Sequence, residues 1–354
     1  GAVITADNWK TDFVGYGYSG VASRITGLTS LYSSSSPLSL KDAPLRILFI
    51  GNSFTDDAVK HLPGLICAAG LSDKITMAHM YYGGRIMEEY NDWSKADYTL
   101  NKFEAGDTGW TAHSSTVSIS DVAMCGRWDI ITMQEHTGNW HGWVWNADEK
   151  ACFDGMFDKL GKTQLTKPKY WYIFSQAYYM MNKIGSGSRS YMTWPLENTK
   201  SAQLTMYGVI AQFARTVMEK CPFDGILATG TMLQNLRTSE VSNVMDLTRD
   251  GYHMDYGITR YGAACLLFES LITPKFGVKL DDNTYRYSSS STEDGKYSTP
   301  VTNENAPIAL AAARYAIAKP YEITDMAPQT EPANLKGEGT SASPYLIGTA
   351  DDMK

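Results

Sequence analysis

The sequence predicts a three-layer α/β/α sandwich built on a mostly parallel sheet of about five strands. From residue 45 onward, short apolar runs alternate with longer stretches of helical periodicity. Short buried strands that alternate with helices indicate a parallel sheet covered by helices on both faces. In such a sheet the catalytic loops lie at the carboxyl ends of the strands, near the point where the strand order reverses.

The first expected strand is LRILFIG (45–51), which ends in glycine and is followed by helical spacing over 56–70. Four further strands are expected along the chain, at 74–82, 128–135, 169–177 and 225–230. The expected helices lie at 146–161, 199–220, 258–272 and 304–319, with one more near 84–104 inside the weakly periodic stretch 84–125.

Changes in residue composition along the chain divide it into three segments. Residues 1–44 are rich in Gly, Ser, Thr and Tyr and form a loop-rich entry segment. Residues 45–319 form the main domain. Residues 320–354 begin Pro-rich and end in a tail that resembles the opening of another module of large bacterial surface proteins, cut short.

Composition excludes several classes of function. The chain has 354 residues, 43% hydrophobic and 19% charged, which is typical of a folded protein. Its net charge is -7 and it has no run of Lys or Arg, so the sequence shows no basic cluster of the kind that binds nucleic acid. No stretch reaches the roughly 18 consecutive apolar residues of a membrane-spanning helix.

Cofactors are also not expected. The five cysteines include no CxxC pair and are odd in number, so we interpret them mainly as buried thiols. The six histidines show no HExxH spacing, and no GxGxxG lies between a strand and a helix. The sequence therefore predicts neither a metal nor a dinucleotide.

A serine follows the first expected strand in GNSFT (51–55), directly before a helix. Ser53 would thus lie at the carboxyl end of that strand, where the backbone N–H groups of a helix N-terminus favour an oxyanion. The alternative is that Ser53 or Thr55 only caps the helix.

A second signal lies in RDGYHMDYG (249–257), where Asp250 and His253 are three residues apart. A serine hydroxyl becomes a good nucleophile when a neutral imidazole takes its proton, and a carboxylate or carbonyl must hold that imidazole in the right tautomer. Taken singly, Asp250 could be a helix cap and His253 a structural histidine.

The order of these blocks resembles that of the SGNH (GDSL-like) hydrolases. GNSFT (51–55), a Gly pair (83–84) and DGYH (250–253) occur in the order of that superfamily, and the resemblance covers roughly residues 45–275. A QE pair (134–135) stands where the superfamily usually has GxND, which is most similar to a little-characterised bacterial branch. The resemblance implies a flavodoxin-like sheet and a catalytic triad of Ser53, His253 and Asp250.

The same resemblance implies an oxyanion hole with three donors. These are the backbone N–H of Ser53, a backbone N–H of the Gly pair, for which we favour Gly84, and the side-chain amide of Gln134. Asn139 is the alternative amide, and Gln134 could instead only satisfy loop backbone. The Gly pair could be a plain turn.

Several neighbouring side chains are candidates for lining the substrate pocket. A Trp-rich loop follows the third strand and could stack on sugar rings, or its rings, including Trp145, could pack over the rim of the domain. The candidates for substrate contact are Asn52, Glu135, His136, Trp140 and Trp143.

We therefore expect a serine esterase that removes a small acyl group, acetyl above all, from a carbohydrate or small molecule. The acidic composition fits a secreted, periplasmic or cell-surface protein. The alternatives are a lipase, thioesterase or acyltransferase with the same triad, and a non-catalytic carbohydrate-binding surface module. The sequence does not identify the ester or the oligomeric state.

Overall fold

The computed structural model describes residues 38–136, 145–164, 166–178, 200–242, 246–288 and 298–328. Most of the expected entry segment and the tail beyond residue 328 lie outside these ranges. The division into three segments thus stays a prediction at both ends of the chain.

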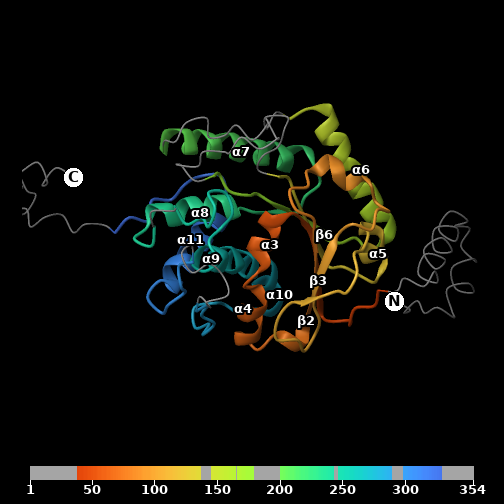
Figure 1. Cartoon of the computed structure of the whole chain (residues 1–354), viewed down its shortest axis with the longest axis horizontal. Helices are drawn as coiled ribbons and strands as arrows, with labels where there is room; N and C mark the ends of the chain where they lie inside the picture. The colour runs from red at the N-terminus through yellow and green to blue at the C-terminus, as the bar shows by residue number, and fades with distance from the viewer. Residues whose placement is uncertain are drawn as a thin grey trace, which may run out of the picture.

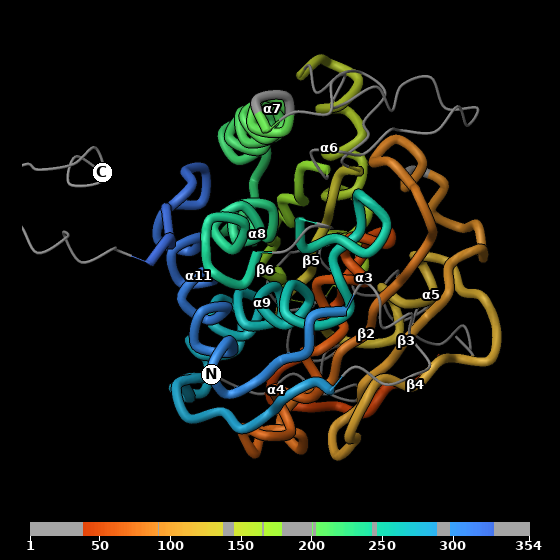
Figure 2. Tube along the Cα trace, turned by 60° about the vertical axis from the view of Figure 1, so that its left-hand side comes forward, coloured from red at the N-terminus to blue at the C-terminus, as the bar shows by residue number. Residues whose placement is uncertain are grey.

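In the described part of the chain, one seven-stranded sheet forms the centre, in the order β4-β3-β2-β1-β5-β6-β7. Figure 2 shows this order from β4 at one edge toward β6. The strands are β1 (Leu45–Gly51), β2 (Ile75–Tyr81), β3 (Thr99–Phe103), β4 (Thr111–Ala112), β5 (Ile130–Gln134), β6 (Lys169–Ile173) and β7 (Gly225–Leu227). The five expected strands are β1, β2, β5, β6 and β7, and these pair in parallel. The predicted α/β fold is confirmed.

Helices cover both faces of the sheet. Figure 1 shows α3, α9 and α11 on one side and α5 and α6 on the other. The α-helices are α3 (Ser53–Val59), α4 (Leu62–Ala68), α5 (Ile119–Met124), α6 (Ala147–Thr163), α7 (Lys200–Lys220), α8 (Thr229–Thr238), α9 (Ile258–Leu267), α10 (Thr273–Phe276) and α11 (Ala306–Ala318). Shorter pieces are the 3₁₀ helices η2 (Ser72–Lys74) and η3 (Met87–Asn91) and the π-helical turn η4 (Phe268–Ile272).

The helix expected near 84–104 is wrong. That stretch holds only the short η3 and then β3, which pairs antiparallel with β2 through Leu100 opposite Met80 and Phe103 opposite Met77. All four side chains are buried, so pairing with a ready sheet edge outweighs a weak helical periodicity.

The helix expected over 56–70 is divided in two. It begins earlier, at Ser53, and is interrupted after Val59. A second helix, α4, begins at Leu62 with Pro63 in its first turn. Proline is well accommodated at the first turn of a helix but not in its interior, which places a boundary here.

Strand β1 is the rigid base of the site. All seven of its residues are buried, and each fully buried side chain such as Ile47 or Phe49 contributes about 1.5–3 kcal/mol. It lies between β2 and β5 in the sheet. The chain therefore adds β2 on one side of β1 and later adds β5 on the other side. The carboxyl end of β1 is therefore the point where the strand order reverses, and α3 begins there.

Candidate active site

The turn between β1 and α3 depends on the particular residues at its start. A Cβ at Gly51 would lie 2.0 Å from the Thr55 hydroxyl oxygen, so glycine is required there. Asn52 caps α3, because its side-chain oxygen accepts the backbone N–H of Phe54 at 3.0 Å. Ser53 is the first residue of the helix.

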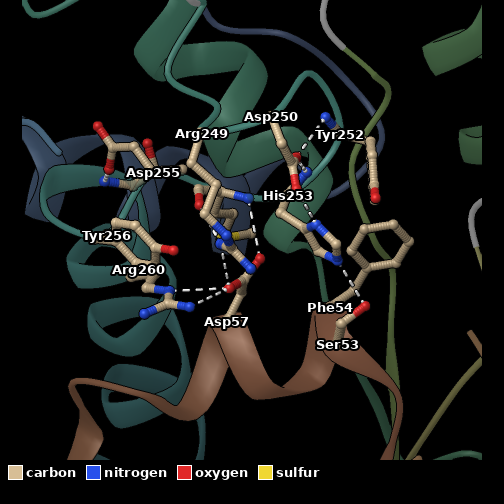
Figure 3. Close-up of polar contacts among 12 residues, drawn as sticks. Ser53, Phe54, Asp57, Arg249, Asp250, Tyr252, His253, Asp255, Tyr256 and Arg260 are labelled. Atoms are coloured by element: carbon tan, nitrogen blue, oxygen red, sulfur yellow. Dashed lines mark hydrogen bonds and ion pairs between the residues drawn. The ribbon is translucent and has the colours of Figure 1, made fainter. Parts of the chain in front are cut away.

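Ser53, His253 and Asp250 form one chain of hydrogen bonds (Figure 3). The Ser53 Oγ lies 2.8 Å from His253 Nε2, and His253 Nδ1 lies 2.6 Å from Asp250 Oδ2. The structure thus brings together residues that are 200 positions apart in the sequence. This is the arrangement in which an imidazole can take the hydroxyl proton while a carboxylate holds its other nitrogen.

The second oxygen of Asp250 fixes the carboxylate itself. Asp250 Oδ1 accepts the backbone N–H groups of Tyr252 at 3.2 Å and of His253 at 2.9 Å. Partial burial alone would raise the pKa of Asp250, but the hydrogen bond and charge of His253 outweigh it and hold that pKa below its usual value. Asp250 is therefore ionised at neutral pH and able to stabilise an imidazolium.

Aromatic rings enclose the imidazole. The ring of Tyr252 lies 4.2 Å from that of His253 between centroids, and Phe54 lies 5.5 Å away on another side. Phe54 is buried and also contacts the ring of His136, at 5.3 Å. These contacts restrict how far the His253 ring can rotate.

Gly84 lies in the loop after β2 with a φ of 71°, a left-handed conformation that favours glycine. The next residue anchors this loop, since the Arg85 guanidinium binds both oxygens of Asp97 and the Tyr98 hydroxyl. Asn52 also holds the loop, by donating its amide N–H to the Arg85 carbonyl at 3.0 Å.

Two backbone donors remain for an oxyanion. Among the described residues, neither the N–H of Ser53 nor that of Gly84 donates a hydrogen bond. Both belong to segments that Asn52 joins, as helix cap on one side and as donor to the Gly84 loop on the other. This agrees with the role expected for these two groups, which stays a prediction.

The expected role of Gln134 does not fit its contacts. Its side chain is fully buried, and its amide nitrogen donates to the Asn52 side-chain oxygen and to the Glu135 carbonyl, both at 3.0 Å. Its amide oxygen accepts the Thr55 hydroxyl at 2.5 Å. Because both N–H bonds are already used, Gln134 has no donor left for a substrate oxygen, and it instead joins β5 to the turn that carries Ser53.

We expect Gln134→Ala to lower the free energy of unfolding by about 1–3 kcal/mol, because it leaves the buried Thr55 hydroxyl without its acceptor. Denaturant unfolding followed by circular dichroism measures this change. Unchanged stability combined with a loss of turnover on the order of 10²-fold would instead return Gln134 to the oxyanion hole.

Comparison with known proteins shows which family the chain belongs to. A family model described as "Domain of unknown function (DUF4886)" matches residues 46–304. The chain belongs to the DUF4886 family. The crystal structure of a DUF4886 family protein from Bacteroides uniformis ATCC 8492 has the same fold, with a TM-score of 0.63 and 24% identity over 79% of this chain and 97% of that one.

A GDSL-like lipase from Bacteroides thetaiotaomicron VPI-5482 also matches, with a TM-score of 0.32 and 13% identity over 72% of this chain and 96% of that one. No curated protein matches the chain.

The expected pocket residues of this DUF4886 chain lie in the interior where they are described. Asn52 is fully buried, and its side chain caps α3 and donates to the Arg85 carbonyl. The Glu135 carboxylate accepts the backbone N–H groups of Met87 and His136, which supports the loop after β2. His136 is also buried. Their expected contact with substrate stays a prediction.

Asn139, Trp140 and Trp143 lie outside the described residues, so their expected roles stay predictions. Trp145 is described, and its ring packs against Phe153 and Phe213 at centroid distances of 6.2 and 6.0 Å. For Trp145, packing over the domain is therefore the better interpretation than a sugar platform.

Three further observations concern the cysteines, clusters of metal ligands and membrane spans of the DUF4886 chain. All five cysteines are thiols rather than disulfides. In the described part of the chain, no three His, Cys, Asp or Glu side chains gather as a metal site would require. No helix in those ranges is long and apolar enough to cross a membrane.

Sequence reasoning did not identify two residues beside the triad, Asp57 and Arg249. They form an ion pair at 2.7 Å that links α3 to the segment carrying His253. Their positions gave a usable signal, because Asp57 follows Ser53 by four residues and so lies about one helical turn away, and Arg249 directly precedes Asp250.

Proposed function

We propose that this protein is a serine esterase that cleaves a small acyl ester through an acyl-enzyme. The observation that carries the proposal is the unbroken hydrogen-bond chain from Ser53 through His253 to an ionised Asp250. It lies at the end of β1, where ligands bind in open α/β sheets.

The reaction follows from the positions of these atoms. Ser53 Oγ attacks the ester carbonyl carbon while His253 Nε2 takes the hydroxyl proton, and the carbonyl oxygen becomes an oxyanion. The backbone N–H groups of Ser53 and Gly84 are the donors we assign to that oxyanion. Collapse of the intermediate breaks the bond to the alcohol, which leaves with the proton from His253.

Water completes the cycle. His253 takes a proton from a water molecule, whose oxygen attacks the acyl carbon on Ser53. The bond to Ser53 Oγ breaks, the serine regains its proton from His253, and the acid is released. Asp250 stays ionised throughout and stabilises the imidazolium formed in each half of the reaction.

The acyl group we propose is acetyl, carried on a carbohydrate outside the cytoplasm. The resemblance of the sequence blocks to SGNH hydrolases supports this substrate class, and the acidic composition agrees with it. A screen of acetylated sugars and polysaccharides for acetate release tests it, with the Ser53→Ala variant as the blank.

Nitrophenyl esters of increasing chain length separate the rival enzymes. We expect the highest kcat/KM for acetate and a decline with longer chains. A preference for long acyl chains would favour a lipase or thioesterase. A fluorophosphonate probe that fails to label Ser53 in the folded protein would favour a non-catalytic binding module.

A further inference from the structure

Asp57 is the centre of a buried ionic cluster beside the candidate triad (Figure 3). It lies on α3, four residues after Ser53, and its side chain is 0% exposed. Its Oδ1 binds the guanidinium groups of Arg249 at 2.7 Å and of Arg260 at 2.9 Å, and its Oδ2 accepts the Met254 backbone N–H at 3.0 Å. A buried carboxylate with this many charged and polar partners is held in one position.

The partners of Asp57 bracket the segment that carries His253. Arg249 directly precedes Asp250, and Met254 directly follows His253. The segment is also closed on itself, because the Arg249 N–H donates to the His253 carbonyl at 3.1 Å and the Arg249 side chain donates to the Met254 carbonyl. Both ends of the DGYH segment are thus tied to one carboxylate on the helix of the serine.

We propose that Asp57 and Arg249 are positioning residues that set the distance between His253 Nε2 and Ser53 Oγ. This inference rests on the proposed function and names what holds its catalytic groups together. The triad cannot supply this rigidity alone, because the Asp250 side chain is 38% exposed and its bond to His253 competes with water. The Asp57 side chain is 0% exposed, so water competes much less for its contacts.

Arg260 provides a matched comparison for Arg249. Both guanidinium groups bind the same Oδ1 of Asp57, and both lie over the ring of Tyr256, at 4.9 Å for Arg249 and 4.7 Å for Arg260. Arg260, however, belongs to α9 and not to the His253 segment. Loss of either arginine removes one cation from Asp57, but only loss of Arg249 removes a tie between Asp57 and the His253 segment.

The test compares Arg249→Gln with Arg260→Gln in acetyl ester hydrolysis, with thermal unfolding measured for both. We expect kcat to fall on the order of 10²-fold in Arg249→Gln at an unchanged KM, since small displacements of a catalytic base cost about that much. Arg260→Gln should lose much less kcat at a similar loss of stability. Arg249→Lys should recover part of the lost kcat, because an ammonium can still bind Asp57. Equal losses of kcat in the two glutamine variants would overturn the proposal.

A spectroscopic measurement separates this inference from the proposed function. In protein with ¹⁵N-labelled histidine, the Nε2 resonance of His253 reports its hydrogen bond to Ser53 Oγ. We expect this signal to keep its wild-type shift in Arg260→Gln and to move in Arg249→Gln as it does in Ser53→Ala. If the wild type labels with no fluorophosphonate and hydrolyses no ester, the proposed function fails, while the signal still decides the positioning role. A wild-type Nε2 shift retained in Arg249→Gln would refute that role.

Discussion

Replacing Ser53 by alanine is expected to abolish ester hydrolysis, with a fall in kcat/KM on the order of 10⁵-fold or more. The variant lacks the oxygen that forms the acyl-enzyme, and the imidazole and carboxylate then have no nucleophile to activate. Only binding and the backbone N–H donors would remain, which sustain a small residual rate. Hydrolysis of nitrophenyl acetate and labelling by a fluorophosphonate probe measure the loss.

The fold should tolerate this change. The Ser53 side chain makes its hydrogen bond to His253, which is itself partly exposed, and the helix cap comes from Asn52 instead. We expect the free energy of unfolding to change by less than about 1 kcal/mol. Ser72→Ala, a partly exposed serine in η2, is the matched control and should retain full activity. Undiminished hydrolysis in Ser53→Ala would assign the activity to another group.

Local sequence signals explain why the fold and the hydrogen-bonded triad could be anticipated. LRILFIG becomes β1 because its residues are apolar at successive positions, as a strand covered on both faces requires. The glycine at 51 and the serine at 53 belong to one tight turn, and Asp250 and His253 belong to another. Each turn is specified by a few neighbouring residues. Each could therefore be predicted from the sequence before the position of the other turn was known.

Features that depend on distant packing could not be predicted in the same way. Gln134 does lie at the end of β5 as expected, but the direction of its amide is decided by Asn52 and Thr55, which lie about 80 positions away. Within the stretch 84–125, β3 forms because β2 has an edge with which it can pair. No local pattern in the sequence shows that this edge exists. The burial of Asp57 likewise depends on two arginines that lie 192 and 203 positions later.

Asp250→Asn tests the role of the carboxylate with almost no change in shape. In the native protein Oδ1 accepts two backbone N–H groups, and Oδ2 accepts the proton on His253 Nδ1. The amide oxygen of an asparagine would have to take the place of Oδ1, because only an acceptor suits two N–H donors. Its NH₂ group would then face Nδ1 and favour the tautomer with the proton on Nε2.

That tautomer cannot accept the proton of Ser53, because Nε2 is already protonated. We therefore expect kcat to fall on the order of 10⁴-fold in Asp250→Asn, with KM little changed. Steady-state kinetics on nitrophenyl acetate measures the loss, and Asp73→Asn, at an exposed carboxylate bound to Lys74, serves as the control with unchanged kcat. A loss below about tenfold would show that the carboxylate charge and the tautomer it selects matter little, and His253 would then need another partner to act as a base.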